Sequence, residues 1–168
     1  MFVPLVEYHG GGQAATFEPL CRHLEDYEWH LAQNSGSGVI ACYRGSRLFD
    51  TEETKTLVKK WVDFYKQYRL ILDSDLIHVR RPDGRSIDCM LHVNPQLDPC
   101  GLAMVYNPTS QTQQMNLKLP LYYTGLGEFA RICPSDGQST EYLIDRDYNI
   151  QIPIEIAPRS IDYLIIEA

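Results

Sequence analysis

Four side chains within the first 44 residues of the sequence have the types and positions expected at the rim of a substrate site. Glu7 and His9 follow a first apolar run, and Tyr43 and Arg44 end a second one. A carboxylate or an imidazole could contact a substrate, a tyrosine could stack on a sugar face, and an arginine could bind hydroxyl or carboxylate groups. We expect these four residues to bind substrate.

The four residues do not form a complete catalytic pair. Glycosidases use two carboxyl groups roughly 5 to 9.5 Å apart across the scissile bond. Glu7 is the one good candidate in the first half, because Asp50 is expected to cap a helix. Glu7 and His9 therefore have two possible roles, catalysis or simple binding and packing. For Arg44, a structural ion pair is as good an interpretation as substrate binding.

Two glycine motifs match enzyme signatures by letters but not by context. His9-Gly10-Gly11-Gly12 is similar to the oxyanion loop of some esterases, yet the G-x-S-x-G pentapeptide of their nucleophile does not occur. The run 36–41 matches G-x-G-x-x-A, but it follows a helix and opens a strand, the reverse of the dinucleotide motif. We expect neither chemistry.

The histidines and cysteines lack metal-ligand spacing. His23 and His30 lie on a predicted helix without a third ligand nearby, and His78 and His92 are expected in strands. The five cysteines are widely spaced and include no C-x-x-C pair. We expect reduced, mostly buried thiols, no metal and no other cofactor.

The elements that must position the rim residues alternate between strand and helix. The runs 2–6 and 39–43 predict buried, parallel strands. Thr16 is expected to cap a helix that ends in the segment 34–38. The apolar positions of this helix recur every three or four residues: Phe17, Leu20, Leu24, Tyr27 and Leu31.

A second, longer helix follows the second strand. Asp50 is expected to cap it, with Glu53 at the reciprocal position of a capping box. Apolar residues at helical spacing predict its buried stripe: Leu57, Val58, Trp61, Val62, Tyr65 and Tyr68. Two strands and two helices cannot cover the hydrogen-bonding edges of the strands. We therefore expect the second half of the chain, another copy or a missing remainder of a barrel to cover these edges.

From about residue 73 the apolar period changes to two, which is typical of an antiparallel sandwich. The clearest strand has isoleucine at every second position from Ile150, and Pro153 within it indicates an edge or a bulge. The predicted strands are 74–80, 86–93, 102–106, 115–123, 128–133, 141–144, 148–156 and 161–167.

Composition and charge exclude some classes of partner. A formal net charge of -7 argues against nucleic acid, which needs a basic face. No apolar run approaches the roughly 18 residues that span a bilayer. We expect no membrane partner and a cytoplasmic location by default, which stays open if the true N-terminus is missing.

Several stretches together resemble the carboxyl-terminal part of an α-galactosidase (melibiase-like) glycoside hydrolase, over nearly the whole chain. The residues that carry the resemblance are 30–39, 41–45, 59–65, 77–84, 91–95, 101–108 and 119–126. The resemblance implies an α/β plus all-β fold. A partial (β/α)8 barrel with the last two β/α units would occupy residues 1–72, and an antiparallel β-sandwich would occupy residues 73–168.

The resemblance also implies a function. In such enzymes two catalytic aspartates lie on earlier strands that this chain lacks, so no catalytic residue is assigned, and Glu7, His9, Tyr43 and Arg44 remain as sugar contacts. We expect a glycoside hydrolase fragment, inactive alone, that binds carbohydrate and pairs with the missing barrel portion or a homo-oligomer. The alternatives are a non-catalytic carbohydrate-binding or structural β-sandwich module, and an enzyme that completes its sheet by oligomerisation.

Overall fold

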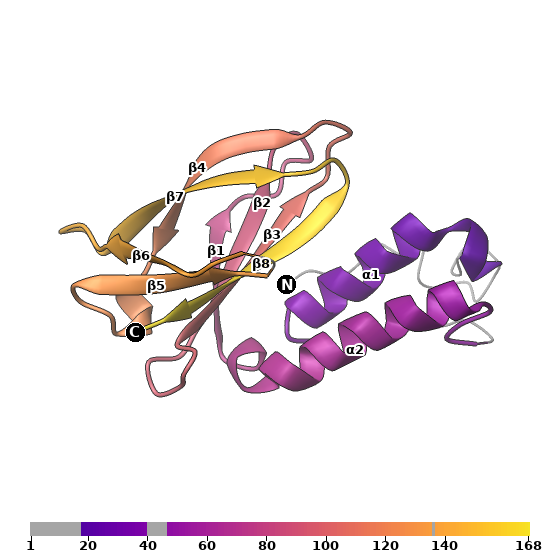
Figure 1. The fold of residues 1–168 in the computed structure, drawn as a ribbon, viewed down its shortest axis with the longest axis horizontal. Coiled ribbons are helices and arrows are strands. Elements are labelled where there is room, and N and C mark those ends of the chain that lie inside the picture. The colour runs from indigo at the N-terminus through magenta and orange to yellow at the C-terminus, as the bar shows by residue number, and fades with distance from the viewer. Residues whose placement is uncertain (1–17, 40–46, 136) are drawn as a thin grey trace. The chain divides into compact units, whose positions relative to one another are not determined.

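The computed structural model of the protein describes residues 18–39, 47–135 and 137–168. The chain divides into two compact units, residues 1–69 and 70–168. Figure 1 shows the helices of the first unit and the strands of the second. The predicted cap Thr16, the predicted strand 2–6 and all but the first residue of the predicted strand 39–43 lie outside the described residues.

The first predicted helix is broken into two elements. A 3-10 turn, η2 (Leu20–Arg22), precedes α1 (Leu24–Gly36), and His23 between them has φ −130°, outside the helical range. The predicted stop is confirmed: Gly38 has φ 68°, and the N–H of Val39 donates to the carbonyl of Asn34 at 3.2 Å.

The second helix, α2 (Glu52–Leu72), is capped differently from the prediction. The hydroxyl of Thr51 accepts the N–H of Thr54 at 3.3 Å, and the hydroxyl of Thr54 accepts the N–H of Thr51 at 3.0 Å. This reciprocal pair is a capping box one residue later than predicted, so Asp50 is not the cap and Glu53 is not its partner. Asp50 instead accepts the backbone N–H of Cys21 at 3.1 Å, which ties the start of α2 to η2.

The buried stripe of α2 is also shifted. Trp61 and Phe64 are buried, whereas Val62 is 40% exposed and does not belong to the stripe. The rings of Trp61 and Phe64 meet edge to face with centroids 5.4 Å apart. Glu28 of α1 joins the two helices, because its Oε1 accepts the Nζ of Lys60 at 2.6 Å and the Nε1 of Trp61 at 3.2 Å.

The second unit contains strands at all the predicted positions. The largest difference is at the end of β4, at Pro120 instead of 123. The strands are β1 (Asp75–Arg80), β2 (Asp88–Val93), β3 (Gly101–Asn107), β4 (Gln113–Pro120), β5 (Phe129–Pro134), β6 (Thr140–Leu143), β7 (Asn149–Ile156) and β8 (Ser160–Glu167). Among these strands, a six-stranded antiparallel sheet has the order β1-β2-β3-β8-β5-β6, and β4 and β7 form a separate antiparallel pair.

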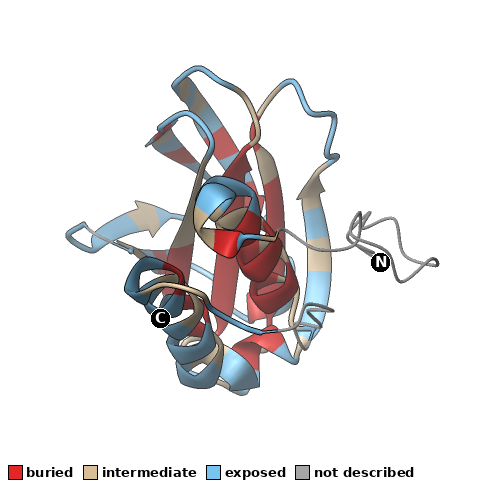
Figure 2. Ribbon diagram, turned by 90° about the vertical axis from the view of Figure 1, so that its right-hand side faces the viewer, coloured by how far each residue is buried: buried red, intermediate tan, exposed pale blue. Residues whose placement is uncertain are grey.

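A hydrophobic core joins the two sheets. Leu117 and Leu119 of β4 and Ile150 and Ile152 of β7 share one buried cluster with residues of β2, β3, β5 and β8. Figure 2 shows buried positions in red along the central strands. The alternation of β7 explains this side of the core, because its other face presents exposed side chains: Gln151, Pro153 and Glu155.

The position of Pro153 is as predicted. Strand β7 pairs with β4 along one side, and no other described strand pairs with it. In the ladder Pro153 stands opposite Asn116, between Ile152 and Ile154. A residue without an N–H is tolerated on a strand with one free side, so Pro153 marks an edge strand.

Candidate functional site

The substrate-binding residues predicted from the sequence lie outside the described residues. Glu7 and His9 fall within residues 1–17, and Tyr43 and Arg44 fall within residues 40–46. Their role as sugar contacts therefore stays a prediction.

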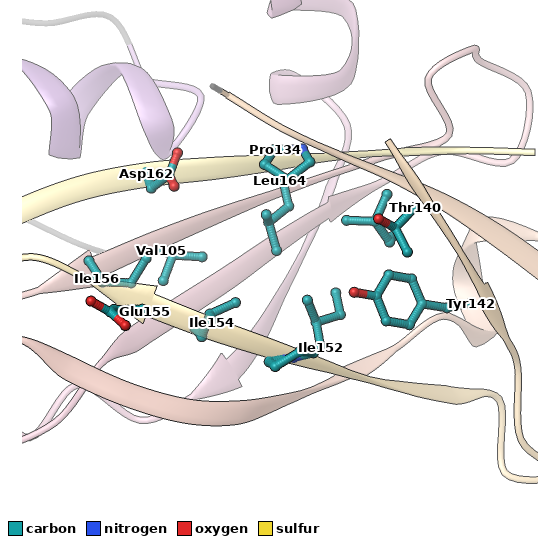
Figure 3. A pocket seen from close by; sticks show the side chains of 12 residues that line it. Val105, Pro134, Thr140, Tyr142, Ile152, Ile154, Glu155, Ile156, Asp162 and Leu164 are labelled. Atoms are coloured by element: carbon teal, nitrogen blue, oxygen red, sulfur yellow. The ribbon is translucent and has the colours of Figure 1, made fainter. Parts of the chain in front are cut away.

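A pocket of about 200 Å³ lies between the two sheets of the second unit, beside β7 (Figure 3). Apolar side chains from several strands form most of its wall, among them Val105, Ile132, Ile152 and Leu164. Figure 3 shows the hydroxyl groups of Thr140 and Tyr142 at one end and the carboxylates of Glu155 and Asp162 at the other. An apolar cavity with a few polar groups is the usual form of a small-ligand site.

The two carboxylates of this pocket already hold neighbouring strands. Asp162 accepts hydrogen bonds from the hydroxyl of Ser135 and, at 2.7 Å, from the N–H of Tyr163. Glu155 accepts the Nε2 of Gln114 at 2.6 Å, which links β7 to β4. Acid–base catalysis needs a carboxyl group that can reach the proton it transfers. The pocket is therefore better suited to binding than to catalysis.

A more open hollow of about 420 Å³ lies on the β4–β7 pair. Its lining combines amide, acidic and apolar side chains: Gln114, Met115 and Asn116 on β4 and Pro153, Ile154 and Glu155 on β7. The last three residues also line the pocket between the sheets. Strand β7 thus contributes to two hollows, and the second includes two amide side chains that can donate and accept hydrogen bonds.

Two buried ionisable groups, one on β2 and one on β3, are held in their protonated forms. Burial raises the pKa of the Cys89 thiol to about 12, and it also raises the pKa of the Tyr106 phenol. Both groups therefore remain protonated at neutral pH and cannot act as nucleophiles. Burial, helped by the charge of Asp83, also raises the pKa of Asp88, which stands opposite Tyr106 in the ladder.

The four described cysteines are free thiols: Cys89 and Cys100 are buried, whereas Cys21 and Cys133 are partly exposed, so the prediction of mostly buried thiols holds for two of the four. Within residues 18–39, 47–135 and 137–168, no group of three or more His, Cys, Asp or Glu side chains is placed to hold a metal ion. No helix of that part of the chain is both long enough and apolar enough to span a bilayer.

The two hollows beside β7 were not predicted from the sequence. Pro153 predicted an edge strand and the predicted strand 141–144 was short, but neither pattern predicts a hollow. Which side chains meet there depends on contacts distant in the sequence.

Comparison with known proteins identifies the fold but not a family. No protein-family model matches the chain, and no curated protein matches it. A Bacillus halodurans protein proposed to be an α-N-acetylgalactosaminidase matches 85% of the chain with a TM-score of 0.56 and 14% identity. AmyP in complex with maltose matches 90% with a TM-score of 0.53 and 10% identity. The Geobacillus thermoleovorans α-amylase, in complex with acarbose, matches 75% with a TM-score of 0.50 and 15% identity.

The match covers only part of each solved structure. The chain spans 32%, 36% and 26% of the lengths of these three structures, in the same order. At such low identity the similarity concerns the fold alone. The described elements, mostly β-strands with two helices, have a fold like one found within glycoside hydrolases.

Proposed function

We propose that the chain forms the carboxyl-terminal part of a glycoside hydrolase that acts on O-glycosidic bonds and is similar to the α-galactosidases. In this proposal residues 1–72 form the last two β/α units of a (β/α)8 barrel and residues 73–168 form a β-sandwich domain. The observation that supports it most is the fold match to part of the α-N-acetylgalactosaminidase-like structure over 85% of the chain. The maltose and acarbose bound by the other two proteins support a carbohydrate as ligand.

The proposed role of the chain is binding and support. Glu7, His9, Tyr43 and Arg44 would contact the sugar, and the catalytic acids would belong to a part of the enzyme outside this chain. The carboxylates of Glu155 and Asp162 are consistent with this division, because each already accepts a hydrogen bond from a neighbouring side chain.

Turnover assays test the catalytic part of the proposal. We expect the purified 168-residue chain to leave the nitrophenyl α-galactoside, α-N-acetylgalactosaminide and α-glucoside unhydrolysed. An affinity tag added after Ala168 in the native gene would allow the polypeptide to be purified in the form that the cell makes. That product is expected to hydrolyse at least one of the three substrates. Turnover by the 168-residue chain that is lost in Glu7→Gln would contradict the proposed division of roles, and an inactive native product would contradict the hydrolase.

The alternative is a non-catalytic carbohydrate-binding or structural module. The two hollows beside β7 favour it, because they offer apolar and amide contacts and their carboxylates are already held in hydrogen bonds. Sugar binding that is unchanged in Glu7→Gln and Tyr43→Ala, together with an inactive native product, would support this alternative.

A further inference from the structure

Three exposed tyrosines form a cluster at one end of the β4–β7 pair. Tyr122 and Tyr123 belong to the 3-10 turn η3 (Tyr122–Thr124) after β4, and Tyr148 immediately precedes β7. The ring centroids of Tyr122 and Tyr123 are 5.1 Å apart, and those of Tyr122 and Tyr148 are 5.2 Å apart. The three residues are 62%, 61% and 41% exposed, in chain order. We call these three residues the tyrosine cluster.

The geometry of the cluster leaves ring surface open to a ligand. The ring of Tyr122 stands nearly perpendicular to both of its neighbours, at 90° to Tyr123 and 88° to Tyr148. An edge-to-face contact covers only one face of one ring, whereas a parallel stack would cover two. Adjacent large rings that stay exposed are a recognised mark of an interaction site.

The backbone that carries the rings is firmly held. The N–H of Leu121 donates to the carbonyl of Tyr148 at 2.7 Å, which joins the two segments of the cluster. The hydroxyl of Thr124 donates to the carbonyl of Leu121 at 2.7 Å, and both residues are buried. A ligand would therefore meet rings that are already in position, which lowers the entropic cost of binding.

Tyr148 occupies a backbone conformation that tyrosine rarely adopts. Its φ is 59°, in the left-handed region where glycine or asparagine is free of strain. Its N–H donates to the carbonyl of Asp145 at 3.0 Å and closes the turn that imposes this conformation. A side chain that the fold keeps at such a position is a reason to look for a function.

The turn beside the rings supplies groups that bind hydroxyls. Asp145, Arg146 and Asp147 are all exposed. The Oδ1 of Asp145 accepts the N–H of Asp147 at 2.9 Å and that of Asn149 at 2.8 Å, so the carboxylate is oriented by the turn. Carboxylate and guanidinium groups present two atoms in one plane, which suits the neighbouring hydroxyls of a sugar ring.

We propose that the tyrosine cluster and the adjoining turn 145–147 of the second unit bind a neutral oligosaccharide. The aromatic faces would take the C–H surface of a pyranose, and the charged groups would bind its hydroxyls. A polyanion or an anionic lipid surface fits poorly, because the turn carries two acids for one base and the chain has a net charge of -7. The choice of sugars as probes rests on the proposed function, whereas the geometry of the site does not.

The test is a titration of the 168-residue chain with maltohexaose and with raffinose. Calorimetry measures the affinity, and changes in amide NMR shifts locate the site. Binding of at least one sugar is expected, with shifts centred on residues 122–123 and 145–148. Tyr122→Ala and Tyr148→Gly should each weaken it by roughly tenfold or more, as loss of an aromatic anchor does. Phe49→Ala, which removes an exposed ring in the other unit, should leave the affinity unchanged.

Tyr148→Gly also separates binding from folding. Glycine relieves the left-handed strain, so the melting temperature should stay within about 4 °C of the wild type while binding is lost. Wild-type affinity in both tyrosine variants, or no binding of either sugar, would overturn the proposal. Loss of binding in Glu7→Gln but not in the tyrosine variants would overturn it as well, while leaving the proposed function intact.

Discussion

Thr54 is a small buried side chain that makes several of the contacts at the start of α2. Its hydroxyl accepts the N–H groups of Asp50 and Thr51 at 3.0 Å each and donates to the carbonyl of Thr51 at 2.9 Å. Replacing the hydroxyl by a methyl group would leave the partly buried N–H groups of Asp50 and Thr51 without this acceptor, while the shape stays the same.

We predict that Thr54→Val lowers the free energy of unfolding by about 1–3 kcal/mol, the cost of unsatisfied buried polar groups. Thr54→Ser keeps the hydroxyl and should lose much less. Urea unfolding followed by circular dichroism measures both variants. Equal stability of Thr54→Val and the wild type would show that the capping box contributes nothing.

Asp88 should make the stability of the protein depend on pH. Burial raises its pKa above the ordinary value of 3.8, so the folded protein keeps the proton to a higher pH than the unfolded chain does. Stability is therefore lost as the pH rises through the interval between 3.8 and the raised pKa. We predict that Asp88→Asn, which cannot ionise, gains stability relative to the wild type between acidic and neutral pH.

Asp145 provides a control of opposite sign. The N–H of Asn149, its largest influence, lowers the pKa of Asp145, so its contribution is present above 3.8 and is lost as the pH falls below that value. Asp145→Asn should accordingly be less stable than the wild type at neutral pH and equal to it in acid. Urea titrations at a series of pH values measure both slopes, and parallel curves for Asp88→Asn and the wild type would contradict the prediction.

At the scale of elements, β7 shows how a free edge is protected. Its side without a described partner strand carries Pro153, which has no N–H to offer another chain. We predict that Pro153→Val raises the tendency to self-associate, because it restores a donor on the free edge. Asn116→Val adds the same side chain at the opposite register position without a new edge donor. Light scattering at matched concentrations should detect association in the first variant and none in the second.

The strands were predictable because their signal is local. Alternating isoleucines and turn residues specify β7 without reference to any other segment. The start of α2 was not predictable in the same way, because Asp50, Thr51 and Thr54 can all act as caps. Asp50 instead accepts a hydrogen bond from the N–H of Cys21, 29 residues away in the sequence, and a local pattern does not contain that contact. The prediction that Val62 is buried was wrong for a similar reason. Helical spacing shows which side of the helix is apolar, but the segments packed against the helix determine how many residues of that side are buried.

At the scale of the whole molecule, the two sheets of the second unit depend on one shared core. Ile132 of β5 is buried in it, and Phe129 of the same strand is exposed. We predict that Ile132→Ala lowers the free energy of unfolding by about 2–5 kcal/mol, whereas Phe129→Ala changes it by about 0.5 kcal/mol or less. Chemical denaturation distinguishes the two. Similar losses in both variants would mean that the core does not connect the sheets as described.

The candidate sites were harder to predict than the sheets. The predicted rim residues were chosen because functional groups in α/β folds lie at the carboxyl ends of strands: Glu7, His9, Tyr43 and Arg44. That rule needs neighbouring strands in a sheet, and the sequence alone does not show which strands those are. The tyrosine cluster joins residues 122–123 to residue 148, and only the pairing of β4 with β7 brings them together.

The order of strands in the larger sheet has a consequence for synthesis on the ribosome. Strand β8 lies between β3 and β5, although it is translated after both of them. Until residues 160–167 have left the exit tunnel, β3 and β5 each present an unfilled edge to solvent or to a chaperone. The larger sheet therefore closes only after translation of its last strand, and a ribosome that stalls before residue 160 would release two half-sheets instead of one.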